Sequence, residues 1–155
     1  MTGTSDGRRD RGSTGVVIRE YRPGDGDALR ELWRSSGFRL LGDDDEGLAT
    51  YVARNPGLFL VAADVAASGE QIVASAMGAW DGRRGWIYHV ATAGSHRRTG
   101  IAAALVTRIE QGLIEVGAKR VNVLVRDESD GGRSFWTAVG YEHAASSQYA
   151  KNLRE

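Results

Sequence analysis

The chain has 155 residues, 41% of them apolar and 26% charged, and its 20 Lys and Arg residues balance its 20 Asp and Glu residues. This length suits one compact domain, and a net charge of zero excludes the global positive field of a strong nucleic-acid or anionic-membrane binder. The absence of cysteine excludes disulfides, thiol nucleophiles and Cys-ligated metal centres.

Residues 1–15 contain almost nothing to bury, and we interpret them as a disordered tail before a single domain over residues 16–155. The tail lacks the apolar segment of a secretory signal. No later apolar run approaches the roughly 20 residues of a membrane-spanning helix. We therefore expect a soluble, cytoplasmic protein with neither a nucleic-acid nor a membrane partner.

Residues 16–21, with the sequence VVIREY, predict a short strand, which Pro23 and Gly24 end. A helix follows, and Asp25 or Asp27 can cap it. The apolar residues of this helix share one face and are Ala28, Leu29, Leu32 and Trp33.

The acidic run DDDE, residues 43–46, leads into a second amphipathic helix that carries Leu48, Tyr51 and Val52. We interpret the run as first-turn charge that favours the helix dipole, and metal binding is the alternative. Next, residues 58–65, 71–80 and 86–92 predict three strands with short turns. Parallel neighbours would need long crossovers, so these strands should form an antiparallel meander.

Residues 101–116 predict an amphipathic helix, which Gly117 is placed to end in a left-handed turn. Its apolar stripe consists of Ile101, Leu105, Ile109, Leu113 and Val116. Residues 120–127 then predict a strand rich in β-branched side chains. This strand should run parallel to residues 86–92, because a helix that connects two strands of one sheet forms the βαβ arrangement.

The last part of the chain predicts a short helix, followed by one or two strands over residues 141–153. The helix opens at the acidic, glycine-rich run DESDGG, residues 127–132, and Gly140 ends it.

The loop SHRRTG, residues 95–100, has the features of an anion site. The first turn of a helix offers N–H groups without intrahelical partners, and the helix dipole adds partial positive charge there. Gly100 allows a ligand close to the backbone, and Arg97 and Arg98 add charges that suit phosphate oxygens. The alternative is a solvated turn in which Thr99 caps the helix. The dinucleotide-binding and P-loop patterns are both absent from the chain.

The run RRTGIA, Arg97 to Ala102, resembles the R/Q-x-x-G-x-G/A signature of the GNAT superfamily of acetyl-CoA-dependent N-acetyltransferases. The neighbouring strands, the helix and the segment FWTAVGYE follow that family's order, over most of Val16 to Leu153. Residues 76–92 and 117–125 resemble small bacterial members related to YpeA. The resemblance implies an α/β fold: a central, mostly antiparallel mixed sheet with helices on both faces and a parallel pair splayed at the cofactor site.

The resemblance also implies the cofactor site and the reaction. Backbone N–H groups would hold the pyrophosphate of acetyl-CoA at Arg97, Arg98, Thr99, Gly100, Ile101 and Ala102. Val90, Ala91 and Thr92 would pair with the pantetheine arm and polarise the thioester carbonyl. A primary amine would then attack the acetyl group directly in a ternary complex. Proximity and oxyanion stabilisation would supply the catalysis, and no metal is expected.

Two positions depart from the family pattern. Trp136 stands where many members have a tyrosine that protonates the leaving thiolate, and Ser129 replaces the usual asparagine. An indole N–H is no practical proton donor. Three interpretations of Trp136 are open. Its side chain packs in the core or against the cofactor, it shapes the acceptor pocket, or its presence indicates that the protein has lost catalytic activity. In the last case the protein would be an acyl-CoA-binding module with little or no turnover. Tyr149 or a water could otherwise replace the acid.

Tyr88 and His89 are the candidate bases. Neighbouring strand residues point to opposite faces, so only one of them should face the acceptor site. A histidine accepts a proton more readily than a tyrosine near neutral pH, although His89 could also be a satisfied histidine packed under a helix. His96 should border the phosphate loop, and His143 should lie on a late strand. Three scattered histidines do not have metal-site spacing.

The acceptor site in this family is bordered by the first two helices and the last strands. These elements correspond to Trp33, Phe38, Leu40, Leu41 and the acidic run 43–46. Carboxylates at this border would favour a cationic amine on a small molecule or a peptide. A polyamine, an amino-sugar antibiotic and a protein N-terminus all fit, and we allow for a homodimer.

Overall fold

The computed structural model describes residues 15–66 and 69–154, so the predicted tail lies outside the described residues except for Gly15. These residues fall into two compact units that meet in sequence at Leu124 and Val125. The single domain expected over residues 16–155 stays a prediction.

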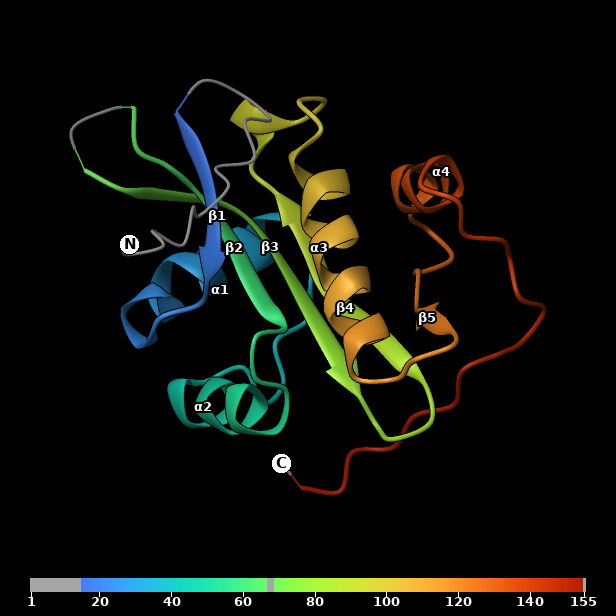
Figure 1. Cartoon of the computed structure of the whole chain (residues 1–155). Helices are drawn as coiled ribbons and strands as arrows, with labels where there is room; N and C mark the ends of the chain where they lie inside the picture. The colour runs from blue at the N-terminus through green and yellow to red at the C-terminus, as the bar shows by residue number, and fades with distance from the viewer. Residues whose placement is uncertain (1–14, 67–68, 155) are drawn as a thin grey trace, which may run out of the picture. The chain divides into compact units, whose positions relative to one another are not determined.

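A five-stranded sheet forms the first unit (Figure 1). Its strands, in both chain and spatial order, are β1 (Val16–Glu20), β2 (Phe59–Asp64), β3 (Gln71–Trp80), β4 (Gly85–Thr92) and β5 (Val121–Val123). The first four are antiparallel neighbours, and β5 runs parallel to β4. The meander and the parallel strand after the helix are therefore confirmed, although β5 has three residues where residues 120–127 had been expected.

Helices cover both faces of this sheet (Figure 1). A 3-10 turn, η1 (Pro23–Asp25), leads into α1 (Gly26–Ser35), which lies with α2 (Asp45–Arg54) on one face. The longer α3 (Ile101–Glu115) covers the other face, where a Cβ added at Gly78 of β3 would lie 2.6 Å from Ile109 Cγ2. Among the described residues, no helix is both long and apolar enough to cross a membrane.

The acidic run opens α2 as predicted. Asp44 is the N-cap, and its Oδ1 accepts a hydrogen bond from the Gly47 N–H at 2.8 Å. Asp45 and Glu46 occupy the first turn, where negative charge favours the helix dipole. Asp25 stands at the N-cap position of α1 but does not cap it. Its carboxylate instead accepts from the Arg22 N–H at 2.8 Å and from the Arg19 guanidinium.

The apolar stripe of α3 is buried at Ile101, Leu105, Ile109 and Leu113. Val116 does not belong to it: this residue is the C-cap, and its side chain is 49% exposed. Gly117 follows with φ of +104°, which confirms the predicted left-handed end.

The second unit contains the predicted helix α4 (Asp130–Ala138), which ends before Gly140 with φ of +98°. Its final strands are absent: the described residues 141–154 contain no strand, so His143 is not on one. Residues 142–154 are exposed throughout, and those in the run AASSQ are small or polar. Side chains of this kind provide little apolar surface to bury on one face, which a strand needs for its stability.

Candidate active site

The link between β4 and α3 places backbone N–H groups at a helix start without a side-chain cap. The chain forms the 3-10 turn η2 (Gly94–His96), and Arg98 and Gly100 then take left-handed φ values of +62° and +82°. Gly100 is the N-cap of α3. The interpretation of Thr99 as N-cap is therefore wrong, and its hydroxyl donates to the His96 carbonyl at 2.6 Å.

This geometry leaves the first turn of α3 open to a ligand. Within the described residues, the N–H groups of Ile101, Ala102 and Ala103 donate no hydrogen bond. Arg97 and Arg98 are exposed beside them. Free N–H groups, the helix dipole and two guanidinium groups are features that favour anion binding, and the anion site at this loop stays a prediction.

His96 ties this loop to the sheet. Its Nε2 lies 2.8 Å from Asp64 Oδ2 at the end of β2, and its Nδ1 lies 2.7 Å from Ser95 Oγ. Hydrogen bonds from the Ala66 N–H and from His96 hold the pKa of Asp64 below its usual value. His96 borders the loop as expected. Asp64 was missed, because 32 residues separate the pair and no local pattern connects them.

The edge of β4 beside the loop is unpaired on one side. Pairing with β5 extends only from Gly85 to Ile87, opposite Val121 to Val123. Beyond Ile87, the described part of β5 offers β4 no further partner. Val90, Ala91 and Thr92 lie in this splayed stretch, so their strand has an open edge where the resemblance places the pantetheine arm.

A bulge in β4 changes the direction of its side chains. Ala91 pairs with Ser75 and Tyr88 pairs with Met77, so two residues, His89 and Val90, lie opposite one residue of β3. His89 has φ of +49°. The bulge breaks the alternation of faces.

Tyr88 and His89 both face the α1–α2 side, so the expectation that only one of them could is wrong. The partner of Tyr88, Met77, belongs to the core cluster on that side, and His89 packs against Trp33 of α1 in the same cluster. Burial, followed by the charge of Asp81, raises the pKa of the Tyr88 phenol.

His89 is enclosed by residues that the sequence assigns to the acceptor border. The ring centroids of Trp33 and Phe38 lie 4.7 Å and 5.1 Å from that of the imidazole. His89 Nε2 lies 3.3 Å from Asp43 Oδ1, and 20% of the His89 side chain is exposed. Burial alone would raise the pKa of Asp43, but His89 and the Leu41 N–H outweigh it and hold the value below normal.

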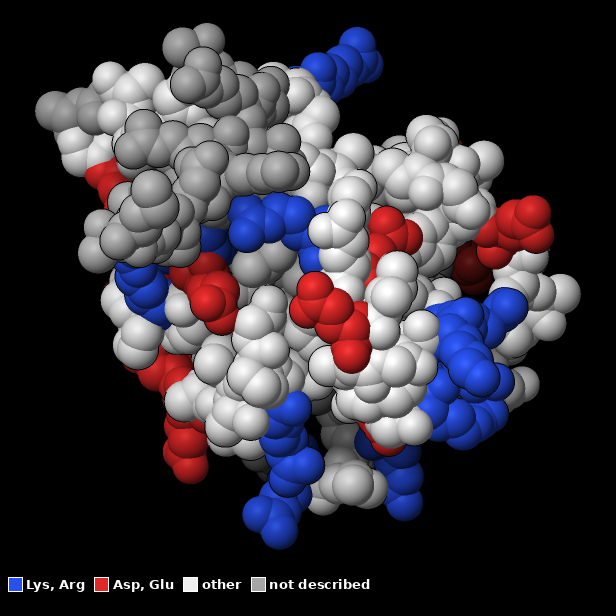
Figure 2. All heavy atoms as spheres, in the orientation of Figure 1, with Lys and Arg blue, Asp and Glu red and all other residues white. Residues whose placement is uncertain are grey.

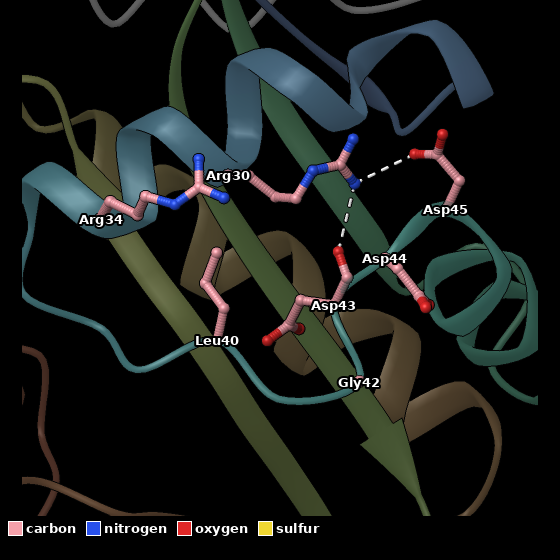
Figure 3. Close-up of a pocket in the computed structure, with 7 residues that line it drawn as sticks. All are labelled: Arg30, Arg34, Leu40, Gly42, Asp43, Asp44 and Asp45. Atoms are coloured by element: carbon pink, nitrogen blue, oxygen red, sulfur yellow. Dashed lines mark hydrogen bonds and ion pairs between the residues drawn. The ribbon is translucent and has the colours of Figure 1, made fainter. Parts of the chain in front are cut away.

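A pocket of about 450 Å³ opens beside Asp43 (Figure 3). It is lined by Arg30, Arg34, Leu40, Gly42, Asp43, Asp44 and Asp45. The Arg30 guanidinium donates to the Asp43 carbonyl at 3.2 Å and to Asp45 Oδ1 at 3.0 Å, while the Asp43 carboxylate turns away from Arg30 (Figure 3). Leu41 is 67% exposed. In the described part of the chain, no group of three or more His, Asp and Glu residues is arranged to hold a metal ion.

The second unit holds the remaining predicted site residues. Trp136 of α4 packs against Phe135 and Tyr141, with ring centroids 5.0 Å and 4.8 Å apart. Ser129 caps α4 by accepting from the Gly132 N–H. Tyr149 is 92% exposed. The catalytic and cofactor-binding roles of Trp136 and Tyr149 stay predictions.

Residues 25–141 match the model of the acetyltransferase (GNAT) family. The chain belongs to this family. This GNAT protein is 35% identical over 128 residues to acetyltransferase SG1711 of Sodalis glossinidius, across 82% of the chain and 87% of the relative. It is 34% identical over 141 residues to acetyltransferase ECA0875 of Pectobacterium atrosepticum, across 90% of the chain and 97% of that relative. The protein is therefore an acetyltransferase, as the resemblance implies, and acetyl-CoA is the acetyl donor of its family.

Solved structures share the fold. Ard1 from Thermoplasma volcanium matches with a TM-score of 0.74 and 21% identity, across 85% of the chain and 86% of Ard1. Naa20 from Chaetomium thermophilum, in complex with a bisubstrate analogue, matches with a TM-score of 0.70 and 23% identity. The match covers 81% of the chain and 70% of Naa20. An aminoglycoside acetyltransferase from an uncultured soil metagenomic sample, in complex with sisomicin, matches with a TM-score of 0.67 and 19% identity. The match covers 90% of the chain and 97% of that acetyltransferase. The mixed sheet with helices on both faces is therefore that of acetyltransferases.

Proposed function

We propose that the protein transfers the acetyl group of acetyl-CoA to a primary amine by direct attack in a ternary complex. The observation that carries the proposal is the uncapped first turn of α3, with free N–H groups from Ile101 to Ala103 beside Arg97 and Arg98. Residues 97–102 would bind the pyrophosphate. The open edge of β4 at residues 90–92 would hold the pantetheine arm and the thioester.

His89 is the base that the surroundings favour. An amine must lose a proton as it attacks, and a neutral imidazole can take it near neutral pH. Tyr88 is disfavoured because its raised pKa leaves less phenolate to act as a base. Tyr149 is the candidate acid, since Trp136 stands in the usual place of the tyrosine and an indole cannot protonate a thiolate.

The acceptor would be an amine on a small molecule or a peptide. Among the proteins with this fold, one is an aminoglycoside acetyltransferase in complex with sisomicin. A suitable panel therefore contains an aminoglycoside, a polyamine and a peptide with a free N-terminus.

Binding of acetyl-CoA is tested by thermal unfolding. At 100 times its Kd, acetyl-CoA should stabilise the protein by about 2.7 kcal/mol, which raises the Tm by about 5–10 °C. The variants Arg97→Glu and Gly100→Trp should lose this shift. Arg83→Glu makes the same charge change in the turn before β4 and should keep it. The absence of any shift for the wild-type protein at millimolar acetyl-CoA would contradict the proposal.

Trp136 favours a second candidate, an acyl-CoA-binding module with little turnover. Loss of a general acid lowers rates typically by about 10²–10⁴-fold. Release of the CoA thiol in the presence of each amine distinguishes the two functions. Turnover with any amine that Arg97→Glu abolishes would rule out the module, whereas a thermal shift without turnover would support it.

A further inference from the structure

The Asp43 carboxylate is held in a fixed orientation between two partners. Its Oδ2 accepts from the Leu41 N–H at 3.0 Å, and its Oδ1 faces His89 Nε2 at 3.3 Å. The Asp43 carbonyl accepts from Arg30, which anchors the loop to α1. Only 11% of the Asp43 side chain is exposed, so it is oriented by the protein and not by water.

His89 is held just as firmly, from both its backbone and its ring. Its carbonyl accepts from Ser75 Oγ at 2.7 Å, and Ser75 Oγ in turn accepts from Trp33 Nε1 at 2.8 Å. The imidazole packs between Trp33 and Phe38. A residue in the left-handed region keeps that conformation only when its surroundings enforce it, and such residues concentrate at functional sites.

One nitrogen of the imidazole is left without a partner. Within the described residues, His89 Nδ1 makes no hydrogen bond. No buried side-chain nitrogen or oxygen among those residues lacks a partner, so Nδ1 must reach solvent. A histidine that only fills the core would have both ring nitrogens satisfied. His89 therefore has one nitrogen directed to a carboxylate and the other open to a ligand.

We infer that Asp43 is a positioning residue that keeps the proton of neutral His89 on Nε2, so that Nδ1 accepts the proton of the acceptor amine. The inference rests on the proposed function. A carboxylate accepts hydrogen bonds only, so the nitrogen that faces it carries the proton. The charged and titratable groups near His89 are Asp43 from the loop before α2, Tyr88 from β4, and Arg30 from α1, which contacts Asp43.

The step balances with His89 as the acceptor of the proton that the amine loses. The amine nitrogen forms a bond to the carbonyl carbon of the acetyl group, and the C–S bond of the thioester breaks. The proton lost by the amine moves to His89 Nδ1, where Asp43 stabilises the resulting imidazolium. CoA leaves as a thiolate, which takes a proton from the candidate acid Tyr149 or from a water. No oxidation or reduction occurs.

A double-mutant cycle on amine acetylation tests the inference. Asp43→Asn should lower kcat about 10-fold or more and His89→Ala about 100-fold or more, with the Kd for acetyl-CoA unchanged in both. If Asp43 acts only through His89, the double variant should match His89→Ala within about twofold. Asp27→Asn removes another carboxylate that contacts Arg30 and should leave kcat unchanged.

Independent effects that multiply in the double variant, or an unchanged kcat in Asp43→Asn, would overturn the inference while the proposed function stands. Wild-type protein without turnover on any amine would overturn both. A second measurement needs no variant: ¹⁵N chemical shifts of the His89 ring in the wild-type protein should show the proton on Nε2 and a bare Nδ1. The opposite tautomer would overturn the inference even if Asp43→Asn fails to fold.

Discussion

Ser75 connects α1 to the bulge in β4. Its side chain is fully buried, and its hydroxyl accepts from Trp33 Nε1 and donates to the His89 carbonyl. One hydroxyl thus joins α1 to the strained residue of β4. Removing it leaves a donor and an acceptor unsatisfied in the core, and each costs about 1–3 kcal/mol.

Ser75→Ala should therefore destabilise the protein by about 2–6 kcal/mol in urea unfolding, because both the Trp33 N–H and the His89 carbonyl lose their partner. Ser35→Ala removes an exposed hydroxyl that donates to the Leu32 carbonyl, and should change stability by less than about 0.5 kcal/mol. Equal effects of the two substitutions would contradict a structural role for the buried chain of hydrogen bonds.

At the scale of elements, Gly47 of α2 lies against the loop that carries Asp43. A Cβ added there would lie 1.9 Å from the Gly42 carbonyl oxygen, a backbone atom that cannot rotate away. Glycine is needed at this point for close approach, although helix propensity alone favours alanine by about 1 kcal/mol.

Gly47→Ala should consequently destabilise the protein, by about 2 kcal/mol or more, through a shift of the loop from Gly42 to Asp44. The matched control is Gly131→Ala in the first turn of α4, where an added Cβ meets nothing within 4 Å. That substitution should be stabilising by up to about 1 kcal/mol. The free energy of unfolding checks both, and a stabilising Gly47→Ala would refute the close approach.

The strands show which features of an element can be predicted from sequence patterns and which cannot. Apolar runs bounded by turn residues predicted β2, β3 and β4, because strands joined by short turns leave this pattern in the sequence. The bulge at His89 leaves no such trace, since it depends on how β4 pairs with β3 and on the contact with Ser75. The strands expected over residues 141–153 are absent because that segment has little apolar surface to bury on one face.

At the scale of the molecule, acidic and basic side chains are interspersed on the face that Figure 2 shows, in keeping with the net charge of zero. Among the residues that the structure describes, four carboxyls have a pKa below the usual 3.8: Asp25, Asp43, Asp64 and Asp81. Burial alone would raise the pKa of Asp25, but hydrogen bonds from Arg19 and from the Arg22 N–H lower it. Backbone N–H groups of Arg84 and Arg83 lower the pKa of Asp81.

These lowered pKa values determine how the stability of the protein changes in acid. Because each folded pKa lies below its unfolded value, the unfolded chain binds more protons in that window, and stability rises with pH. Their contribution is complete above about pH 5 and should be lost as the pH falls through 3.8 and below. The urea midpoint should therefore drop between pH 5 and pH 3.

Asp25→Asn provides the comparison. It should lower stability at pH 7, since Arg19 and the Arg22 N–H lose a charged acceptor that is mostly buried. The difference in the free energy of unfolding between variant and wild type should become smaller below pH 4, where protonation of Asp25 weakens the same interaction in the wild type. A gap that stays constant from pH 7 to pH 3 would refute the assignment.

The sequence alone determined the features that local patterns encode. Periodicity predicted α1, α2 and α3 and the meander, and the run Arg97–Ala102 indicated an anion-binding helix start and the acetyltransferase family. Only the tertiary structure decided which side chains meet. Asp64 with His96, Ser75 with His89 and Asp43 with His89 are pairs from elements far apart in the chain. Such contacts form when the helices pack on the sheet, and neither the periodicity nor the spacing of residues in the sequence predicts them.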